Sequence, residues 1–343
     1  MNATPLPHIN IRDLKPGAFL SGVYSLVNPQ TAMTRGGKPY FKSLIRDASG
    51  EAAVRKWTFD EAMLPEVTAT GYAHVDGRVE LYNGQLQVVL DHIQAVDVSV
   101  TDLVALLPAT HKNIGEMFAQ VTGLLHSMHD PGMRALADAY LCDEAMMAAF
   151  RHAPAATNVH HAWIGGLLEH THQLMHLADR MLPLYPQLNR DLVLLGLFLH
   201  DLAKTVELEW EKGFNYTMDG QLIGHIVRGA IWLQLKAALA ARTSGVRLSN
   251  ETITVLQHIL LSHHGSLEHG AAKLPSTPEA IFVAMLDNLE AKTTISIHAV
   301  ARDRLHAGNA DFTERVWSLD ARMYRPDPLQ PVVGSVPVTA SAQ

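Results

Sequence analysis

The sequence predicts an α+β protein of two domains, a small N-terminal β-barrel followed by an all-α helical bundle. Three observations predict this order. Short segments rich in β-branched and aromatic residues fill the first hundred residues, separated by turn signals. From Thr101 onward, apolar residues recur at helical spacing instead. The chain has 343 residues, enough for two domains, and its 48% hydrophobic content can bury a substantial core.

Composition also limits the class of protein. A single cysteine, Cys142, excludes a disulfide within the chain and suits a reducing compartment. The first residues lack the pattern of a signal peptide, and the longest apolar run, Leu192–Leu199, is too short for a membrane span. We therefore expect a soluble, cytoplasmic protein with no membrane partner. The net charge of −7 argues against a broad basic surface for duplex DNA, but a local basic groove remains compatible with it.

The first domain, residues 8–98, is expected to hold five or six short strands. Asp76-Gly77 and Asn83-Gly84 are dipeptides typical of tight turns. The expected strands are 18–27, 40–47, 52–58, 70–75, 78–82 and 85–96. So many short strands in one small domain favour a closed barrel, for which the OB-fold is the natural candidate.

Basic and aromatic residues alternate in one part of this domain. Between Arg35 and Lys56, six basic residues stand against two acidic ones. Single-stranded nucleic acid is held by a positive groove with aromatic platforms. The residues expected to bind it are Arg35, Lys38, Tyr40, Phe41, Lys42 and Trp57. The alternative is an exposed strand whose aromatic side chains belong to the core.

The rest of the chain is expected to be helical. Residues 99–157 form a helical connector, and Thr277 followed by Pro278 is a sound start for the last helix. The expected helices are 133–150, 159–182, 190–203, 220–242, 250–263 and 278–305. The tail, residues 323–343, has no periodicity and is expected to be disordered.

Histidines and aspartates interrupt the apolar faces of these helices. The chain has 20 histidines, and eleven of them lie between His160 and His269. The interruptions are His170, His200-Asp201, His225, His263-His264 and Asp287. Burying a carboxylate beside an imidazole is costly unless a cation or strong hydrogen bonds compensate. A set of such intrusions on successive helices favours a metal site, and Lys204 follows one turn after Asp201, placed to meet a phosphate oxygen.

The order of these residues resembles the H…HD…H…HH…D pattern of the HD phosphohydrolase superfamily. The stretches 158–171, 199–204, 219–225 and 261–265 are similar to YhaM-type 3′-to-5′ exoribonucleases. That family joins an N-terminal OB-fold to an HD domain, which places the HD domain here at residues 158–322. Similarity to HD proteins that cleave cyclic dinucleotides is poorer, because no Gly-Tyr-Pro follows the HD segment.

The resemblance implies divalent-metal ligands, commonly for manganese or cobalt. The implied ligands are His170, His200, Asp201, His225, His263, His264 and Asp287. Seven ligands exceed what one ion needs, so we hypothesise one or two ions, with two bridged by Asp201 and a hydroxide. Mixed imidazole and carboxylate ligands suit Mn, Fe, Co or Zn. His160 and His161 belong to the family-like motif. They are expected either to contact a phosphate of the substrate or to have a structural role.

The sequence thus predicts a metal-dependent 3′-to-5′ exoribonuclease. It would hydrolyse single-stranded RNA, and DNA if the site admits it, to nucleoside 5′-monophosphates with a metal-activated water. Asp201, His200 and Lys204 are the predicted catalytic residues. The first alternative is an HD phosphohydrolase acting on nucleotides or another small phosphate ester. The second is a nucleic-acid-binding protein with a vestigial metal site. The metal, the preference for RNA or DNA, and a homo-oligomeric state stay open.

Overall fold

The structure is a computed structural model that describes residues 8–34, 36–82, 85–98, 106–157, 161–210, 214–303 and 311–329. The chain divides into two compact units, Met1–Ile295 and Ser296–Gln343. Four features of the sequence prediction, Arg35, His160, the Asn83-Gly84 turn and the tail from residue 330, lie outside the described residues. Among the helices of the described residues, none has the length and apolar character needed to cross a membrane.

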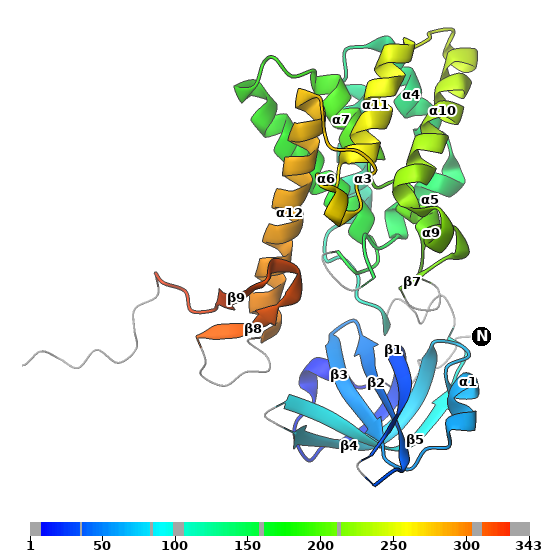
Figure 1. Ribbon diagram of the computed structural model, residues 1–343, viewed down its shortest axis with the longest axis vertical. Coiled ribbons are helices and arrows are strands. Elements are labelled where there is room, and N and C mark those ends of the chain that lie inside the picture. The colour runs from blue at the N-terminus through cyan, green and yellow to red at the C-terminus, as the bar shows by residue number, and fades with distance from the viewer. Residues whose placement is uncertain are drawn as a thin grey trace, which may run out of the picture. The chain divides into compact units, whose positions relative to one another are not determined.

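A closed five-stranded barrel forms the N-terminal part (Figure 1). Its strands are β1 (Phe19–Met33), β2 (Pro39–Asp47), β3 (Gly50–Lys56), β4 (Tyr72–Tyr82) and β5 (Gln85–Ala95). They follow the order β1-β2-β3-β5-β4, in which β3 and β5 pair in parallel, whereas β1 with β2, β2 with β3, β1 with β4 and β4 with β5 pair antiparallel. Short helical turns at Ile11–Asp13, Glu61–Met63 and α1 (Leu64–Val67) accompany the barrel. This topology is that of an OB-fold and confirms the predicted barrel.

One predicted turn in the barrel is wrong. The segments 70–75 and 78–82 are a single strand, β4, and Gly77 lies within it, opposite Leu90. The register with β5 shifts between Asp76 and Gly77. A Cβ at position 77 would lie 2.5 Å from the carbonyl oxygen of Val89. The glycine therefore permits a close approach of two strands at an irregularity instead of forming a turn.

The helical part of the first unit encloses a large core of buried residues, contributed by α3 to α7 and by α10 to α12. Its helices are α3 (Ile114–His126), α4 (Pro131–Leu141), α5 (Glu144–His152), α6 (Gly166–Met181), α7 (Arg190–Leu199), α8 (Lys204–Glu207), α9 (Met218–Leu222), α10 (Gly224–Ser244), α11 (Asn250–Ser262) and α12 (Pro278–Asp303). A two-stranded sheet, β6 (Leu208–Glu209) with β7 (Asn215–Tyr216), joins α8 to α9. The predicted all-α bundle is confirmed.

Several helix boundaries differ from the prediction for local reasons. The predicted helix 133–150 is two helices, because the side chain of Asp143 accepts a hydrogen bond from the backbone N–H of Met146 and caps a new start. The predicted helix 159–182 begins only at Gly166, since Gly165 adopts a φ of 78°. Gly224, with a φ of 75°, separates α9 from α10 within the predicted helix 220–242.

The second unit contains a short hairpin that was not predicted. Its strands are β8 (Phe312–Val316) and β9 (Ala321–Tyr324), with a helical turn at Trp317–Leu319 between them. Arg315 pairs with Arg322 across the antiparallel register. The hairpin extends regular structure to Tyr324, so the first residues of the predicted tail belong to a strand.

Candidate metal centre

Five helical segments of the first unit position the predicted ligands. His170 lies one turn into α6, and His225 lies in the first turn of α10. His200 and Asp201 follow the buried α7, and His263 follows α11 in the same way. Asp287 lies on α12. His170 and His200 have no exposed surface, and Asp201 is 3% exposed. Each apolar helix therefore delivers its polar ligand to the interior of the bundle.

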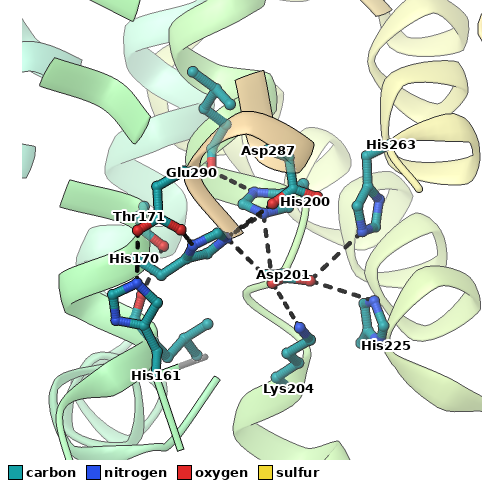
Figure 2. Close-up of polar contacts among 12 residues, drawn as sticks. His161, His170, Thr171, His200, Asp201, Lys204, His225, His263, Asp287 and Glu290 are labelled. Atoms are coloured by element: carbon teal, nitrogen blue, oxygen red, sulfur yellow. Dashed lines mark hydrogen bonds and ion pairs between the residues drawn. The ribbon is translucent and has the colours of Figure 1, made fainter. Parts of the chain in front are cut away.

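The carboxylate of Asp201 lies between two groups of histidines (Figure 2). Its Oδ1 is 3.3 Å from Nε2 of His225 and 3.5 Å from Nε2 of His263. Its Oδ2 is 3.4 Å from Nε2 of His200 and 3.7 Å from Nε2 of His170. The Lys204 ammonium lies 2.7 Å from the same Oδ2. The structure thus brings the predicted catalytic residues together.

The remaining predicted ligands extend these two groups. Oδ1 of Asp287 lies 3.2 Å from Nε2 of His170. His264 joins His225 and His263 in a set whose ligand atoms all lie within 4.8 Å of one another. His170, His200 and Asp201 form a second such set. All seven predicted ligands are therefore part of one cluster, in which only His264 and Asp287 are partly exposed.

The ring nitrogens of the histidines are oriented by their Nδ1 contacts. Nδ1 of His200 lies 2.7 Å from the carbonyl oxygen of Leu197, and Nδ1 of His263 lies 2.7 Å from that of Leu260. Nδ1 of His264 likewise lies 2.8 Å from the carbonyl oxygen of His269. A carbonyl can only accept, so each of these Nδ1 atoms carries a hydrogen. The lone pair of the neutral ring is then on Nε2, the atom that a metal ion would use.

Three buried polar atoms in the cluster have contacts that a bound cation would complete. Asp201 Oδ1, His225 Nε2 and His263 Nε2 have no hydrogen-bond partner among the described residues. A buried polar atom without a partner costs about 1–3 kcal/mol. Because all three atoms converge on one place, a divalent cation there would satisfy them together. Imidazole nitrogens with carboxylate oxygens are suitable donors for such an ion.

Electrostatics favour positive charge at the same place. Burial raises the pKa of Asp201, but Lys204 and His200 outweigh it and hold the pKa well below its ordinary value. Burial lowers the pKa of His170, yet hydrogen bonds to Asp287 and Glu290 raise it to about 10. Without a bound cation, the ring of His170 is therefore protonated at neutral pH, and its positive charge lies beside the carboxylates of Asp287 and Glu290. A metal ion would take the place of that positive charge.

Two buried glutamates, Glu290 and Glu207, were missed by the sequence reasoning. Oε2 of Glu290 lies 2.7 Å from Nδ1 of His170, and Oε2 of Glu207 lies 2.8 Å from Nδ1 of His225. A signal existed for Glu290, which follows Asp287 by three residues and so shares its helix face. Neither glutamate has a place in the H…HD…H…HH…D order of the ligands.

The predicted substrate contact of His161 is not supported. His161 is 1% exposed, and its Nε2 lies 2.7 Å from Oε1 of Glu290. Its ring packs on the ring of His170, with centroids 5.4 Å apart. The side chain therefore supports the cluster from inside the bundle, the structural role of the two considered.

The predicted nucleic-acid residues of the barrel divide between surface and core. Lys38, Lys42 and Trp57 are exposed, and Tyr40 is half-buried beside Trp57, with ring centroids 5.1 Å apart. The prediction is wrong for Phe41, which is fully buried against Phe59 because successive residues of β2 face opposite sides.

Sequence reasoning also missed two members of this aromatic surface. The guanidinium of Arg55 lies 5.8 Å from the ring centroid of Tyr40, and 5.9 Å from those of Trp57 and Tyr82. The side chain of Tyr82 is exposed. Tyr82 lies at the end of β4, far in sequence from the others, so their proximity depends on closure of the barrel.

Comparison with known proteins gives matches to both parts of the chain. The family model of the HD domain matches residues 167–292. A 3′-5′ exoribonuclease YhaM of Geobacillus sp. (strain WCH70) is 31% identical over 310 residues, 89% of this chain and 91% of that protein. The protein of the same name from Bacillus subtilis (strain 168) is 32% identical over 311 residues, 88% of this chain and 94% of that protein.

Two solved structures each match about a quarter of the chain. The second OB-fold domain of replication protein A from Methanococcus maripaludis is 20% identical, with a TM-score of 0.20, and the match covers 27% of this chain and 99% of that one. The mitochondrial single-stranded DNA binding protein Rim1 from S. cerevisiae is 15% identical, also with a TM-score of 0.20, over 24% of this chain and 99% of that one. The fold assignment rests on the strand order of the barrel.

Proposed function

The chain belongs to the YhaM family of 3′-5′ exoribonucleases, and we propose on that premise that it removes nucleotides from the 3′ end of single-stranded RNA. The products would be nucleoside 5′-monophosphates, and a single strand of DNA is proposed as a further substrate. The observation that carries this proposal is the convergence of histidine Nε2 atoms on the carboxylate of Asp201. Two of these nitrogens, in His225 and His263, and Oδ1 of Asp201 itself lack a hydrogen-bond partner among the described residues.

The seven clustered ligands are proposed to hold one or two divalent ions, with Mn²⁺ preferred. Support for two ions comes from Asp201, whose two oxygens face different histidines. Oδ1 faces His225 and His263, and Oδ2 faces His200 and His170. When bound, divalent ions lower the pKa of water and offset the charge of phosphoryl oxygens. Measurement of bound metal per chain at full activity decides between one ion and two.

Lys204 is proposed to assist at the phosphoryl group. Its ammonium is anchored by Asp201 at 2.7 Å, and its side chain is only 13% exposed. Asp201 raises the pKa of Lys204 against the effect of burial, which lowers it, so the side chain carries its charge at neutral pH. A fixed cation at this position offsets negative charge that develops on phosphoryl oxygens during hydrolysis.

The barrel is proposed to bind the RNA strand. Tyr40, Lys42, Arg55 and Trp57 lie on one side of the β2–β3 pair, where Lys42 and Arg55 are direct partners. Rings that flank a guanidinium offer stacking surfaces to bases, and Lys38 and Lys42 offer positive charge to phosphates. In OB-folds, the second and third strands are the usual nucleic-acid face. Arg35 and His160 stay predicted contacts that lie outside the described residues.

An assay on oligoribonucleotides tests the proposed function. The full chain is incubated with a 5′-labelled single-stranded RNA and Mn²⁺, with and without a chelator. We expect a ladder of products shortened from the 3′ end, which disappears on chelation. The same preparation is tested on a panel of nucleotides. Hydrolysis of nucleotides without shortening of RNA would contradict the proposal and favour the phosphohydrolase alternative.

Self-association of the chain is a further proposal. Exposed apolar side chains recur every four residues along α10, at Ile223, Val227, Ile231, Leu235 and Leu239. A row of this kind is typical of a surface that another protein covers. Sedimentation velocity on the full chain tests it, and a monomer at all concentrations would contradict it.

A further inference from the structure

Two carboxylates stand directly behind the histidine cluster. Glu290 on α12 is 5% exposed, and Glu207 at the end of α8 is 7% exposed. Glu290 contacts Nδ1 of His170, and Glu207 contacts Nδ1 of His225. In both rings, the opposite nitrogen, Nε2, lies within 3.7 Å of Asp201 (Figure 2). Each carboxylate is therefore on the far side of its ring from the site of the cation.

The other histidines of the cluster have backbone carbonyls in this position, at Leu197, Leu260 and His269. A carbonyl cannot donate, so the tautomer of those rings is fixed by the backbone. His170 and His225 instead depend on side chains that mutation can change. We propose that Glu290 and Glu207 are positioning residues, each of which keeps the hydrogen of its histidine on Nδ1 and so leaves Nε2 available to the cation. This inference rests on the proposed metal site.

The contacts of Glu290 determine what a glutamine would do there. Oε1 accepts hydrogen bonds from Nε2 of Gln173 and from Oγ1 of Thr294, both at 2.8 Å. In Glu290→Gln, the amide oxygen would keep those two donors, and the NH₂ group would face Nδ1 of His170. Nδ1 could then only accept, and the hydrogen of a neutral ring would move to Nε2. An Nε2 atom that carries a hydrogen cannot ligate a metal ion.

Glu207 gives the same result from a different segment. Its Oε1 accepts from the backbone N–H of His225 at 3.1 Å and lies 3.0 Å from Nδ1 of the same ring, while its Oε2 lies 2.8 Å from that Nδ1. In Glu207→Gln, the amide oxygen would stay with the backbone N–H, and the NH₂ group would take the Oε2 position, the nearer of the two to Nδ1. The neighbouring backbone packs closely on Glu207, because a Cβ at Gly220 would collide with the backbone carbonyl oxygen of Glu207.

Glu169 provides a matched control. It precedes His170 on α6 and is 8% exposed, close to the burial of Glu290 and Glu207. Its carboxylate contacts Thr110, Lys112 and the indole N–H of Trp163. Replacement of Glu169 by glutamine therefore also removes a buried negative charge, but it leaves the ring of His170 untouched.

The experiment is calorimetric titration of the metal-free full chain with Mn²⁺. Glu290→Gln and Glu207→Gln are expected to raise the dissociation constant about 10- to 100-fold, while Glu169→Gln leaves it unchanged. Thermal melts of the same metal-free proteins by circular dichroism show whether each variant is folded. A purely structural role for the two glutamates would lower the melting temperature without changing the dissociation constant.

Parental Mn²⁺ affinity in either folded variant would overturn the inference, and so would an equal loss of affinity in Glu169→Gln. If Glu290→Gln does not fold, Glu207→Gln carries the test from a different helix. Failure of the proposed function has a different signature. A parent chain that binds Mn²⁺ but does not shorten RNA would overturn the exoribonuclease and leave the positioning role standing.

Discussion

Asp201 lies within 3.7 Å of ring nitrogens from four histidines and 2.7 Å from the Lys204 ammonium. Replacement of Asp201 by alanine would leave these positive or ligating groups without the carboxylate that joins them. We expect hydrolysis of labelled RNA to fall to background, whereas RNA binding in a filter assay stays close to the parent value, since the barrel surface is unchanged. Asp138→Ala, which removes an exposed carboxylate paired with His126, is the control and should keep full activity. Retained hydrolysis in Asp201→Ala would contradict the catalytic scheme.

A second prediction concerns the buried Asp47 in the barrel. Its Oδ2 lies 2.9 Å from Nε2 of His8 and accepts from the backbone N–H of Ile11. The hydrogen bond to Asp47 raises the pKa of His8 against burial. Burial raises the pKa of Asp47, but hydrogen bonds from His8 and Ser49 outweigh it and lower the pKa.

The sign of the pH dependence follows from these two shifts. The His8 contribution to stability is complete below its unfolded pKa, near 6.5, and is lost as pH rises through the folded pKa. The Asp47 contribution is complete above its unfolded pKa, near 3.8, and is lost as pH falls through the folded pKa. We therefore expect His8→Gln to lower the melting temperature more at about pH 5.5 than at about pH 8.5. Equal losses at both pH values would contradict this account.

At the scale of residues, the predicted metal ligands could be identified from the sequence more readily than the groups that contact their Nδ1 atoms. His170, Asp201 and Asp287 stand out because a polar side chain on an apolar helix face is anomalous. The supports of His200 and His263 are backbone carbonyls, which every residue has, so composition cannot mark them. Phe41 was misassigned because its neighbours are basic, while its side chain follows the alternation of the strand into the core.

At the scale of elements, the N-terminus of α6 is the most tightly constrained helix start near the cluster. Gly165 has a φ of 78°, and a Cβ at Gly166 would collide with the carbonyl oxygen of His161. This contact sets where α6 begins and therefore where His170 lies one turn later. Backbone geometry thus accounts for both glycines, through the positive φ of Gly165 and the close backbone approach at Gly166.

Gly166→Ala is expected to destabilise the chain by roughly 1–3 kcal/mol, because the added methyl forces the helix away from the His161 segment. The shift would also displace His170 and weaken Mn²⁺ binding. Gly123→Ala is the control, since Gly123 lies within α3 with no atom near its added Cβ, and it should stabilise by roughly 0.5–1 kcal/mol. Urea unfolding and Mn²⁺ titration measure both effects. Unchanged stability in Gly166→Ala would contradict the argument.

Element types were predictable, but several boundaries were not. The 3.6-residue spacing of apolar residues located each long helix from α6 to α12. The spacing continues through the caps and positive-φ glycines that end a helix, so 133–150 and 220–242 were each read as one element. In the barrel, Asp76-Gly77 has turn composition, yet the glycine serves a register shift within β4.

At the scale of the whole molecule, the chain is expected to divide its work between strand capture and hydrolysis. Trp57→Ala removes an exposed ring of the barrel that flanks Arg55. We expect RNA binding to weaken by about 1–3 kcal/mol, the usual value of one base–aromatic stack. Hydrolysis of a small chromogenic phosphodiester should be unchanged, because that substrate needs only the metal centre. Trp317→Ala, at a side chain 92% exposed in the C-terminal hairpin, is the control and should change neither value.

Loss of small-substrate hydrolysis in Trp57→Ala would contradict this division.

The order of the two domains could be predicted from the switch between strand and helix periodicity. The C-terminal hairpin could not, because β8 and β9 are short and carry mixed polar and apolar residues. Tyr82 joins the surface of Trp57 only when the barrel closes, a long-range pairing that local patterns do not reveal.

The backbone anchors of His200 and His263 have one more consequence. Since each ring is oriented by a carbonyl of its own helix, we expect folding to place both Nε2 atoms for metal binding before an ion binds. Chelation should therefore leave the far-ultraviolet circular dichroism of the chain unchanged, and added Mn²⁺ should restore activity without a refolding lag. A preformed site of this kind allows one divalent ion to be exchanged for another. The concentrations of the available metal ions would therefore help to determine which ion is bound.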